Sequence, residues 1–311
     1  MKKIDIVVPC YNEEACIRPL YEAVDKVFRG IEDYRYRILY VNDGSRDKTL
    51  EKLREIHAEH PETTDYISFS RNFGKEGAIY AGLSKSDGDL VVLMDADLQH
   101  PPELIPEMIK GIQEGYDCVG ARRVDRNGEP PVRSAFSRLF YKVINKMTGM
   151  HLVQGGSDYR MMTRQMVDAM LQLQERERFT KGIMSWVGFE TKWIEYQNVE
   201  RIAGESKWSF FGLAKYAING FVAFATAPLK AVIWLGSLIT LVAFIYAIIT
   251  IVSTLHSGAE RTGYATLIIL ILFMGGVVIT LIGVVGEYIA RLYHEMKMRP
   301  IFIEKESSLK K

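Results

Sequence analysis

The chain lacks the glycine-rich loops that many nucleotide-binding proteins use. No Gly-x-Gly-x-x-Gly follows the first predicted strand, residues 4–9, and no Walker loop occurs anywhere in the 311 residues. Because such loops hold the phosphates of dinucleotides and of ATP, their absence argues against both binding modes. The formal net charge is only +1, whereas nucleic-acid-binding proteins usually carry a strong basic excess. We therefore expect no nucleic acid partner.

Cysteine is also scarce. The three cysteines, Cys10, Cys16 and Cys118, are odd in number and show no metal-binding spacing. A disulfide framework is therefore not expected, and the thiols should be reduced and mostly buried in a cytosolic domain. The N-terminus starts with an apolar strand rather than a basic segment and a long apolar core, so we expect no cleavable signal peptide.

Charged residues are missing from two long stretches near the C-terminus. Residues 231–255 and 262–286 each contain 25 positions without Asp, Glu, Lys, Arg or His. About 20 apolar residues suffice to span a bilayer. One such stretch could be a buried core helix, but two of them, joined by residues 256–261, predict a transmembrane hairpin.

Basic residues flank the predicted hairpin outside its connector. Lys215 and Lys230 precede the first span without an acidic residue nearby, and several basic residues follow the second, whereas the connector holds only Arg261. Because positive charge stays on the cytoplasmic side of a membrane, the N-terminal domain and the C-terminus should both be cytoplasmic. The sequence thus predicts an integral membrane protein with two spans.

The N-terminal part of the chain alternates between apolar strands and helices. Strands are predicted at 4–9, 36–41, 66–69, 89–94 and 117–121, and helices at 14–29, 47–59, 75–86 and 103–114. This alternation is typical of an α/β fold with a largely parallel, helix-covered sheet. In such sheets ligands bind at the carboxyl ends of the strands.

The strand at 89–94 ends in two carboxylates. Asp95 and Asp97 face the same side of extended backbone, and Gln99 continues the alternation before a proline pair. Adjacent like charges repel unless a cation lies between them, so the pattern favours Mg²⁺ or Mn²⁺ bridging to the phosphates of a nucleotide diphosphate. The alternative is a solvated turn, which the position after a buried strand makes less attractive.

Polar segments also follow the first two strands, at 9–13 and 41–47. Asp43 can accept a hydrogen bond from a ring nitrogen of uracil or guanine. It could instead cap the helix at 47–59, although Asp47 is better placed for that role. Because both segments end neighbouring strands, they predict two parts of a nucleotide-binding crevice.

Several motifs then occur in an order that resembles that of a known family. They are Pro9-x-Tyr11-Asn12-Glu13, Asn42-Asp43-Gly44-Ser45, Arg71-Asn72-Phe73-Gly74-Lys75 and Asp95-Ala96-Asp97-Leu98-Gln99-His100-Pro101-Pro102. Together they are similar to the signature set of family-two glycosyltransferases with a GT-A (Rossmann-like) fold. More narrowly, the chain resembles the dolichol-phosphate-mannose-synthase-like branch, whose members glycosylate polyprenyl phosphates and carry C-terminal membrane helices. The Gln-x-x-Arg-Trp motif of processive polysaccharide synthases is absent, which argues against a polymerase.

The resemblance implies a site for the donor and a metal. The residues that match nucleotide-binding positions are Pro9, Tyr11, Glu13, Asp43, Lys75 and Asp95. The resemblance implies that Asp95, Asp97 and Gln99 bind Mg²⁺ or Mn²⁺, which neutralises the departing nucleoside diphosphate. It also makes Asp97 a residue of the catalytic centre.

The resemblance further implies a site for a lipid phosphate. The matching residues are Arg122, Arg133, Ser137, Arg201 and Lys207, the last two in a loop that could close on phosphates near Trp208. A shorter intervening loop leaves the choice between Arg122 and Arg123 open. A solvated basic loop is the alternative, but the planar fork of arginine suits phosphate.

Asp158 follows a Gly155-Gly156 turn and matches the family's proposed catalytic base. A helix N-cap is the competing interpretation. Because the oxygen of a phosphate monoester is already anionic near neutral pH, Asp158 could position groups rather than remove a proton.

Apolar stripes predict two helices on the membrane surface, at 136–147 and 209–226. For the first, ordinary core packing explains the pattern about as well. The predicted organisation is a catalytic domain at 1–208, an interfacial helix at 209–228, a hairpin at 229–289 and a cytoplasmic tail at 290–311.

The sequence therefore predicts an inverting, metal-dependent transfer of one sugar at the cytoplasmic face of a bacterial plasma membrane, serving cell-envelope glycans. The expected donor is UDP-glucose or UDP-GlcNAc, and the expected acceptor is a polyprenyl phosphate such as undecaprenyl phosphate. Alternatives are GDP-mannose as the donor, a donor that carries another aminosugar, or a catalytically silent membrane scaffold. The intact pair Asp95 and Asp97 argues against a silent protein. A homo-oligomer is compatible with the sequence, which does not decide it.

Overall fold

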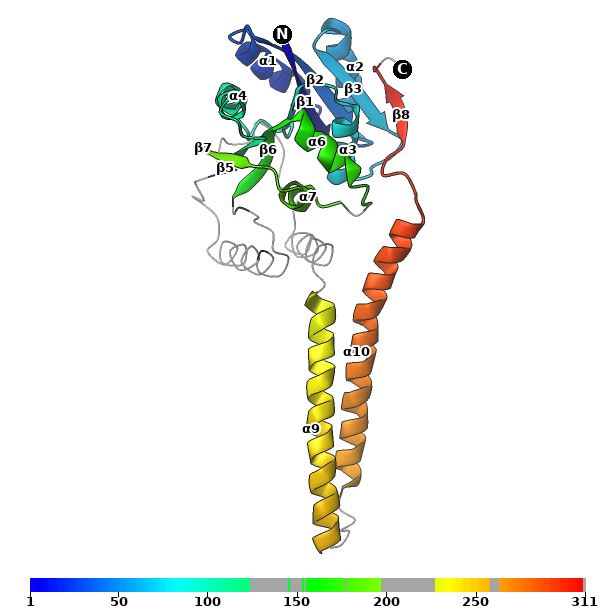
Figure 1. Ribbon diagram of the computed structural model, residues 1–311. Helices are drawn as coiled ribbons and strands as arrows, with labels where there is room; N and C mark the ends of the chain where they lie inside the picture. The colour runs from blue at the N-terminus through cyan, green and yellow to red at the C-terminus, as the bar shows by residue number, and fades with distance from the viewer. Residues whose placement is uncertain are drawn as a thin grey trace. The chain divides into compact units, whose positions relative to one another are not determined.

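The computed structural model describes residues 1–123, 145, 153, 155–176, 178–196, 227–257 and 263–309. The chain forms two compact units (Figure 1). The first contains Met1–Lys215 together with Arg299–Lys311, and the second contains Tyr216–Met298. The last residues of the chain thus return to the unit in which the chain begins.

An eight-stranded sheet forms the centre of the first unit, in the order β7-β5-β6-β4-β1-β2-β3-β8. The strands are β1 (Lys2–Cys10), β2 (Tyr34–Asn42), β3 (Thr64–Phe69), β4 (Leu90–Leu93), β5 (Cys118–Arg123), β6 (Gly156–Thr163), β7 (Thr191–Tyr196) and β8 (Glu304–Ser307). β1, β2, β3 and β4 run parallel to one another, as does the β5–β7 pair. β6 and β8 run antiparallel to their neighbours. The predicted α/β class with a mostly parallel sheet is confirmed.

The helices follow the strands in alternation. They are α1 (Ile17–Phe28), α2 (Thr49–Glu59), α3 (Lys75–Lys85), α4 (Ile105–Gln113) after the short 3-10 helix η1 (Pro102–Leu104), α6 (Arg164–Gln172) and α7 (Thr180–Trp186). Every strand and helix predicted between residues 4 and 121 is present within a few residues of its expected bounds. The elements β6, α6, α7, β7 and β8 were not predicted.

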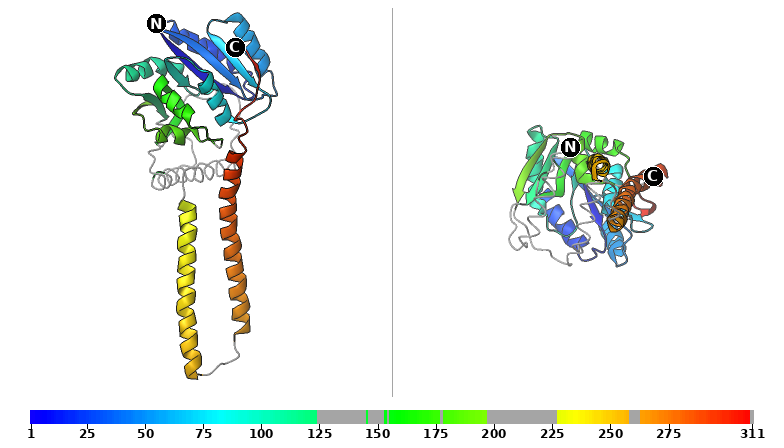
Figure 2. Two further views of the ribbon diagram at one scale, coloured as in Figure 1. Left: turned by 45° about the vertical axis from the view of Figure 1, so that its right-hand side comes forward. Right: turned by 90° about the horizontal axis from the view of Figure 1, so that it is seen from below.

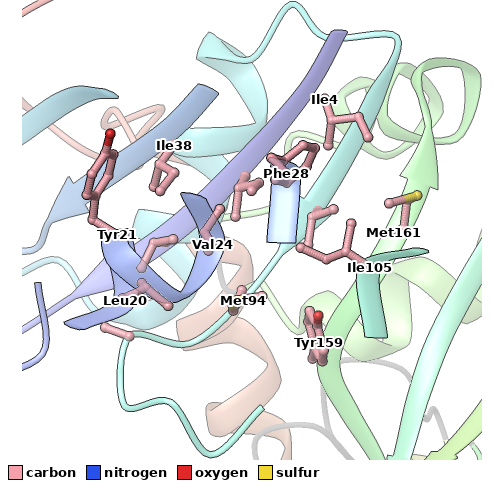
Figure 3. Packing of buried hydrophobic residues seen from close by; sticks show 14 of the residues in the cluster. Ile4, Leu20, Tyr21, Val24, Phe28, Ile38, Met94, Ile105, Tyr159 and Met161 are labelled. Carbon is pink, nitrogen blue, oxygen red and sulfur yellow. The ribbon is translucent and has the colours of Figure 1, made fainter. Parts of the chain in front are cut away.

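Side chains of β2 alternate between two apolar cores on opposite faces of the sheet, as extended backbone requires. Ile38 and Tyr40 belong to the core under α1 and α4, whereas Leu39 and Val41 pack against α3. Figure 3 shows the first core, where Leu20, Val24 and Phe28 of α1 lie over Ile4 and Ile38 of the sheet. All three cysteines are buried and free, as predicted. Covered on both faces, the sheet is a rigid platform for the loops at its carboxyl edge.

The C-terminal segment completes the sheet at the free edge of β3 (Figure 2). Glu306 receives hydrogen bonds from Arg54 and from the Tyr66 hydroxyl, the latter at 2.7 Å. Phe302 stacks on Phe69 with 5.0 Å between ring centroids, and the Ser70 amide donates to the Ile303 carbonyl at 3.0 Å. The charged sequence of β8, Glu-Lys-Glu-Ser, is therefore held by specific side-chain partners.

The second unit is a hairpin of two helices, α9 (Ala227–Ser257) and α10 (Tyr264–Met296), which lie side by side (Figure 2). Both predicted apolar runs are thus helical. Within the described residues, Phe273–Met296 is long and apolar enough to cross a membrane, and α9 holds the shorter apolar segment Trp234–Tyr246. Large apolar side chains are exposed along both helices, among them Trp234, Phe244, Phe273 and Ile279. That both helices span a membrane stays a prediction.

Phe302→Ala should loosen the C-terminal strand from the sheet. Removing a partly buried phenyl ring from the stack on Phe69 should cost about 2–4 kcal/mol, which lowers the melting temperature of the first unit by roughly 5–10 °C. The matched control is Ile303→Ala, because the Ile303 side chain is half exposed. Thermal unfolding of the detergent-purified protein measures both, and equal melting temperatures for the two variants would contradict the packing described.

Candidate functional site

Loops at the carboxyl ends of β1 and β2 are joined by hydrogen bonds. The backbone N–H of Asn12 donates to Ser45 Oγ at 3.0 Å, and the side-chain oxygen Oδ1 of Asn12 accepts from the backbone N–H of Arg46 at 2.8 Å. The Glu13 amide donates to Thr49 Oγ1 at 2.9 Å. Asn12 has a φ of 54°, in the left-handed region that asparagine tolerates. The predicted nucleotide-binding residues Tyr11 and Glu13 therefore lie on a loop fixed to its neighbour, and Pro9 lies just before that loop, at the end of β1.

Asp43 is buried and organises the loop before α3. Its Oδ1 accepts from the Phe73 amide at 2.6 Å, and its Oδ2 accepts from the Gly74 amide at 2.9 Å. Burial raises the pKa of Asp43, and these two amides counteract only part of that rise. Asp43 therefore does not cap α2. The N-cap residue of α2 is Lys48, whose side chain makes no capping hydrogen bond, and Asp47, one residue earlier, accepts from the backbone amide of Thr49 at 3.0 Å.

Gly44 allows this loop to approach closely. Its φ is +64°, and a Cβ atom there would lie 2.4 Å from the carbonyl carbon of Arg71. Only glycine fits without displacing backbone. The Asn-Asp-Gly-Ser motif and the Arg-Asn-Phe-Gly-Lys motif are thus in direct contact, which the sequence spacing did not reveal.

Lys75, the first residue of α3, joins two predicted functional carboxylates. Its Nζ lies 2.7 Å from Asp95 Oδ1 and 2.7 Å from Asp158 Oδ2. Burial would raise the pKa of Asp95, but Lys75 and His100 outweigh it and bring the value to about 2. The pKa of Lys75 is raised by the same two carboxylates against the effect of burial. At neutral pH all three groups are therefore charged.

Asp158 lies on β6, so the helix N-cap interpretation is wrong. Besides Lys75, it faces Lys181 of α7, whose Nζ is 3.7 Å from Asp158 Oδ1 and donates to the Gly156 carbonyl at 3.0 Å. Burial alone would raise the pKa of Asp158, but Lys181 and Lys75 hold it well below its usual range. A carboxylate so acidic is a poor acceptor for a substrate proton near neutral pH.

His100 fixes the loop that carries the predicted metal ligands Asp95, Asp97 and Gln99. Its Nε2 lies 3.7 Å from Asp95 Oδ2, its Nδ1 is 2.8 Å from the Tyr196 hydroxyl, and its ring stacks on Tyr159. Leu98 in this loop has a φ of 57°, a left-handed conformation that a bulky side chain rarely adopts and that strains the backbone. The Gln99 amide donates to Asp97 Oδ1 at 3.2 Å. Strain of this kind is often found at ligand sites.

The residues predicted to bind a divalent cation offer the oxygen atoms that such ions prefer. The ammonium of Lys75 lies 2.7 Å from Asp95 Oδ1, so a divalent cation would have to bind the other carboxylate oxygen or displace Lys75. Within the described residues no group of three or more His, Cys, Asp or Glu side chains could hold a metal. The remaining ligands would have to come from Gln99, water and a phosphate, which is how Mg²⁺ is commonly bound.

The predicted acceptor residues are described only in part. Arg122, on the exposed end of β5, lies 3.9 Å from Glu195, and its backbone is paired with Gly156 beside Asp158. Arg133, Ser137, Arg201 and Lys207 lie outside the described residues, as do the two predicted interfacial helices. Their assignments stay predictions.

Sequence reasoning missed Lys181 and His100. His100 stood in the quoted motif, and its place one residue after Gln99 was the available signal. Lys181 gave none, because α7 was not predicted and a lysine in a short helix is unremarkable. Its proximity to Asp158 arises only from the tertiary fold.

Two family descriptions match the chain. Residues 5–171 match "Glycosyl transferase family 2", which is more than half of the chain. The chain is a family-two glycosyltransferase. Residues 227–292 match "GtrB C-terminal hairpin", which corresponds to α9 and α10. The expected family and activity class are therefore confirmed.

Two relatives are similar to this chain over nearly its whole length. A putative glycosyltransferase, CsbB, of Bacillus subtilis (strain 168) is 45% identical over 98% of this chain and 92% of its own. A prophage-derived bactoprenol glucosyl transferase of Shigella flexneri is 40% identical over 98% of both chains. Among solved structures, glucosyl-3-phosphoglycerate synthase of Mycobacterium tuberculosis is 20% identical, with a TM-score of 0.46 over 70% of this chain and 76% of its own.

Gly44→Ala should disturb the enzyme more than an alanine at an exposed turn such as that of Gly30. A side chain at a φ of +64° costs about 1–2 kcal/mol, and the clash with Arg71 should also shift the loop that Asp43 holds. Gly30→Ala is the matched control, since the nearest atom to its added Cβ is 3.6 Å away. Thermal unfolding and calorimetric binding of UDP measure the two effects. Unchanged UDP binding by a folded Gly44→Ala enzyme would contradict the proposed place of the donor.

Proposed function

We propose that the enzyme transfers a single glucosyl group from UDP-glucose to a polyprenyl phosphate such as undecaprenyl phosphate. The observation that carries the proposal is the cluster of Asp95, Lys75 and Asp158 at the carboxyl edge of the sheet in a family-two enzyme. Relatives named bactoprenol glucosyl transferases, similar over nearly the full length, support this choice of sugar and acceptor.

The reaction exchanges one bond to the anomeric carbon for another. An oxygen of the lipid phosphate attacks that carbon, the bond to the UDP oxygen breaks, and its electron pair leaves with the diphosphate. Attack from the opposite face inverts the configuration. The acceptor oxygen is already anionic near neutral pH, so the chain must orient it and keep its charge apart from the departing one. The low pKa of Asp158 fits a positioning role and not that of a base.

The donor half of the site combines the predicted nucleotide-binding residues. Pro9 lies at the end of β1, Tyr11 and Glu13 lie on the loop that follows it, and Asp43 fixes the loop that leads to Lys75. Asp95, Asp97 and Gln99 are the residues that would hold Mg²⁺ or Mn²⁺. A divalent cation there supplies positive charge to the diphosphate. Lys75 places a second positive charge next to the same carboxylate.

The return of the chain to its first sheet supports an even number of membrane spans. β3 precedes the hairpin and β8 follows it, yet the two strands are paired. Both ends of the hairpin must therefore be on the same side of any membrane that it crosses. If Phe273–Met296 spans, a second crossing is needed, and α9, with its shorter apolar segment, is the proposed one. The distribution of positive charge supports a cytoplasmic location for this common side, where nucleotide sugars are made.

Purified enzyme, a panel of radiolabelled nucleotide sugars and a short polyprenyl phosphate test the proposed reaction. We expect transfer from UDP-glucose with Mg²⁺ or Mn²⁺ and little transfer from UDP-GlcNAc or GDP-mannose.

Asp97→Asn should lose most activity while keeping its melting temperature, because an amide binds a hard cation poorly. Transfer to no polyprenyl phosphate from any donor would reject the function, and full activity of Asp97→Asn without added metal would reject the metal.

Labelling of introduced cysteines tests the membrane topology. The native thiols are buried, and replacing them removes residual background. Ser257→Cys, at the end of α9, should react with an impermeant thiol reagent applied to intact cells. Lys305→Cys, on exposed β8, should react only after the membrane is opened. The opposite pattern would place the site away from cytoplasmic nucleotide sugars.

A further inference from the structure

Two lysines from different helices lie on either side of the Asp158 carboxylate. Lys75 Nζ is 2.7 Å from Oδ2, and Lys181 Nζ is 3.7 Å from Oδ1. The family resemblance assigns Lys75 to the nucleotide but assigns nothing to Lys181. Both side chains are partly exposed, so a ligand can reach them.

Lys181 retains hydrogen-bonding capacity. An ammonium group has three donors. Within the described residues, its contact at hydrogen-bonding distance is the Gly156 carbonyl at 3.0 Å, and the carboxylate at 3.7 Å is too far for a good hydrogen bond. The ammonium is therefore held in place by the backbone of β6 while it can still donate to an anion.

Glu76 fixes the position of Lys181. Glu76, half-buried on α3 next to Lys75, accepts hydrogen bonds from both the backbone amide and the hydroxyl of Thr180, the amide at 2.9 Å. Thr180 is the first residue of α7 and the neighbour of Lys181. A single turn of α3 therefore positions both lysines, one directly and the other through Thr180.

The place of Lys181 favours the acceptor over the donor. Gly156, which it contacts, is the register partner of Arg122, which the family resemblance predicts to bind the lipid phosphate. Lys75 instead reaches Asp95, in the donor half of the site. Asp158 thus lies between two ammonium groups, one of which also reaches the predicted donor residue Asp95.

We propose that Lys181 binds the phosphate of the lipid acceptor directly, and that Glu76 is a positioning residue that holds Lys181 there through Thr180. This proposal rests on the proposed function. Its chemistry is that of a phosphate monoester bound by a fixed ammonium group, with Asp158 keeping that group oriented. The step itself is unchanged, because Lys181 donates hydrogen bonds and exchanges no proton.

Kinetics with varied acceptor and calorimetry with UDP test the proposal on the full-length enzyme. Lys181→Ala should raise the KM for the polyprenyl phosphate about 10–100-fold, the usual loss for a hydrogen bond to a charged group, with UDP affinity changed less than about twofold. Lys181→Arg should restore part of the loss. The matched control is Lys192→Ala, a surface lysine paired with Glu114 on the same domain, which should alter neither value.

Glu76→Ala should raise the same acceptor KM to a lesser degree, and Glu76→Gln, which can still accept from Thr180, should recover it. If Lys181→Ala weakens UDP binding instead, the contact belongs to the donor diphosphate and the proposal is wrong. Unchanged acceptor KM in a folded Lys181→Ala enzyme also overturns it. Failure of the wild-type enzyme to use any polyprenyl phosphate would reject the proposed function, whereas wild-type transfer with an insensitive Lys181 rejects only this inference.

Discussion

The two ion pairs of Lys75 are the interaction on which the site depends. The ammonium lies 2.7 Å from a carboxylate that follows β4 and 2.7 Å from another on β6. Partly buried carboxylates that lack a counter-charge cost several kcal/mol. Lys75 offsets that cost, so that Asp95 and Asp158 can share a small volume while both stay ionised. A divalent cation can then replace Lys75 as the partner of a carboxylate, and a substrate phosphate can replace a carboxylate as the partner of Lys75.

The fold creates this arrangement because residues from two other segments hold the first turn of α3. The Gly74 amide is held by Asp43 after β2, and Glu76 is bound to Thr180 at the start of α7. Between these two anchors Lys75 has little freedom to move. A substitution at Asp43 or Glu76 should therefore shift the first turn of α3 and with it Lys75. The pairing of Lys75 with the two carboxylates should then change, although neither substituted residue touches them.

Much of the fold could be predicted from the sequence, because the strands and helices between residues 4 and 121 alternate strongly. The carboxyl-edge rule also placed Asp43 and Asp95 correctly at one edge of the sheet. The later elements were missed for physical reasons. β6 lies between β5 and β4, but the charged residues Asp158 and Arg160 interrupt the apolar run that is expected of such a strand. β8 has no apolar alternation at all. Its pairing depends on partners such as Arg54, some 250 residues away in the chain.

A structure of the enzyme with UDP and Mn²⁺ tests the central claim most directly, namely that the carboxylates around Lys75 form the transfer site. The account predicts Mn²⁺ bound by oxygens of Asp95 and Asp97 and by the diphosphate. Lys75 should remain on Asp158 or move to a phosphate oxygen. Mn²⁺ and UDP bound elsewhere, with the Lys75–Asp95 pair intact and facing no ligand, would contradict it.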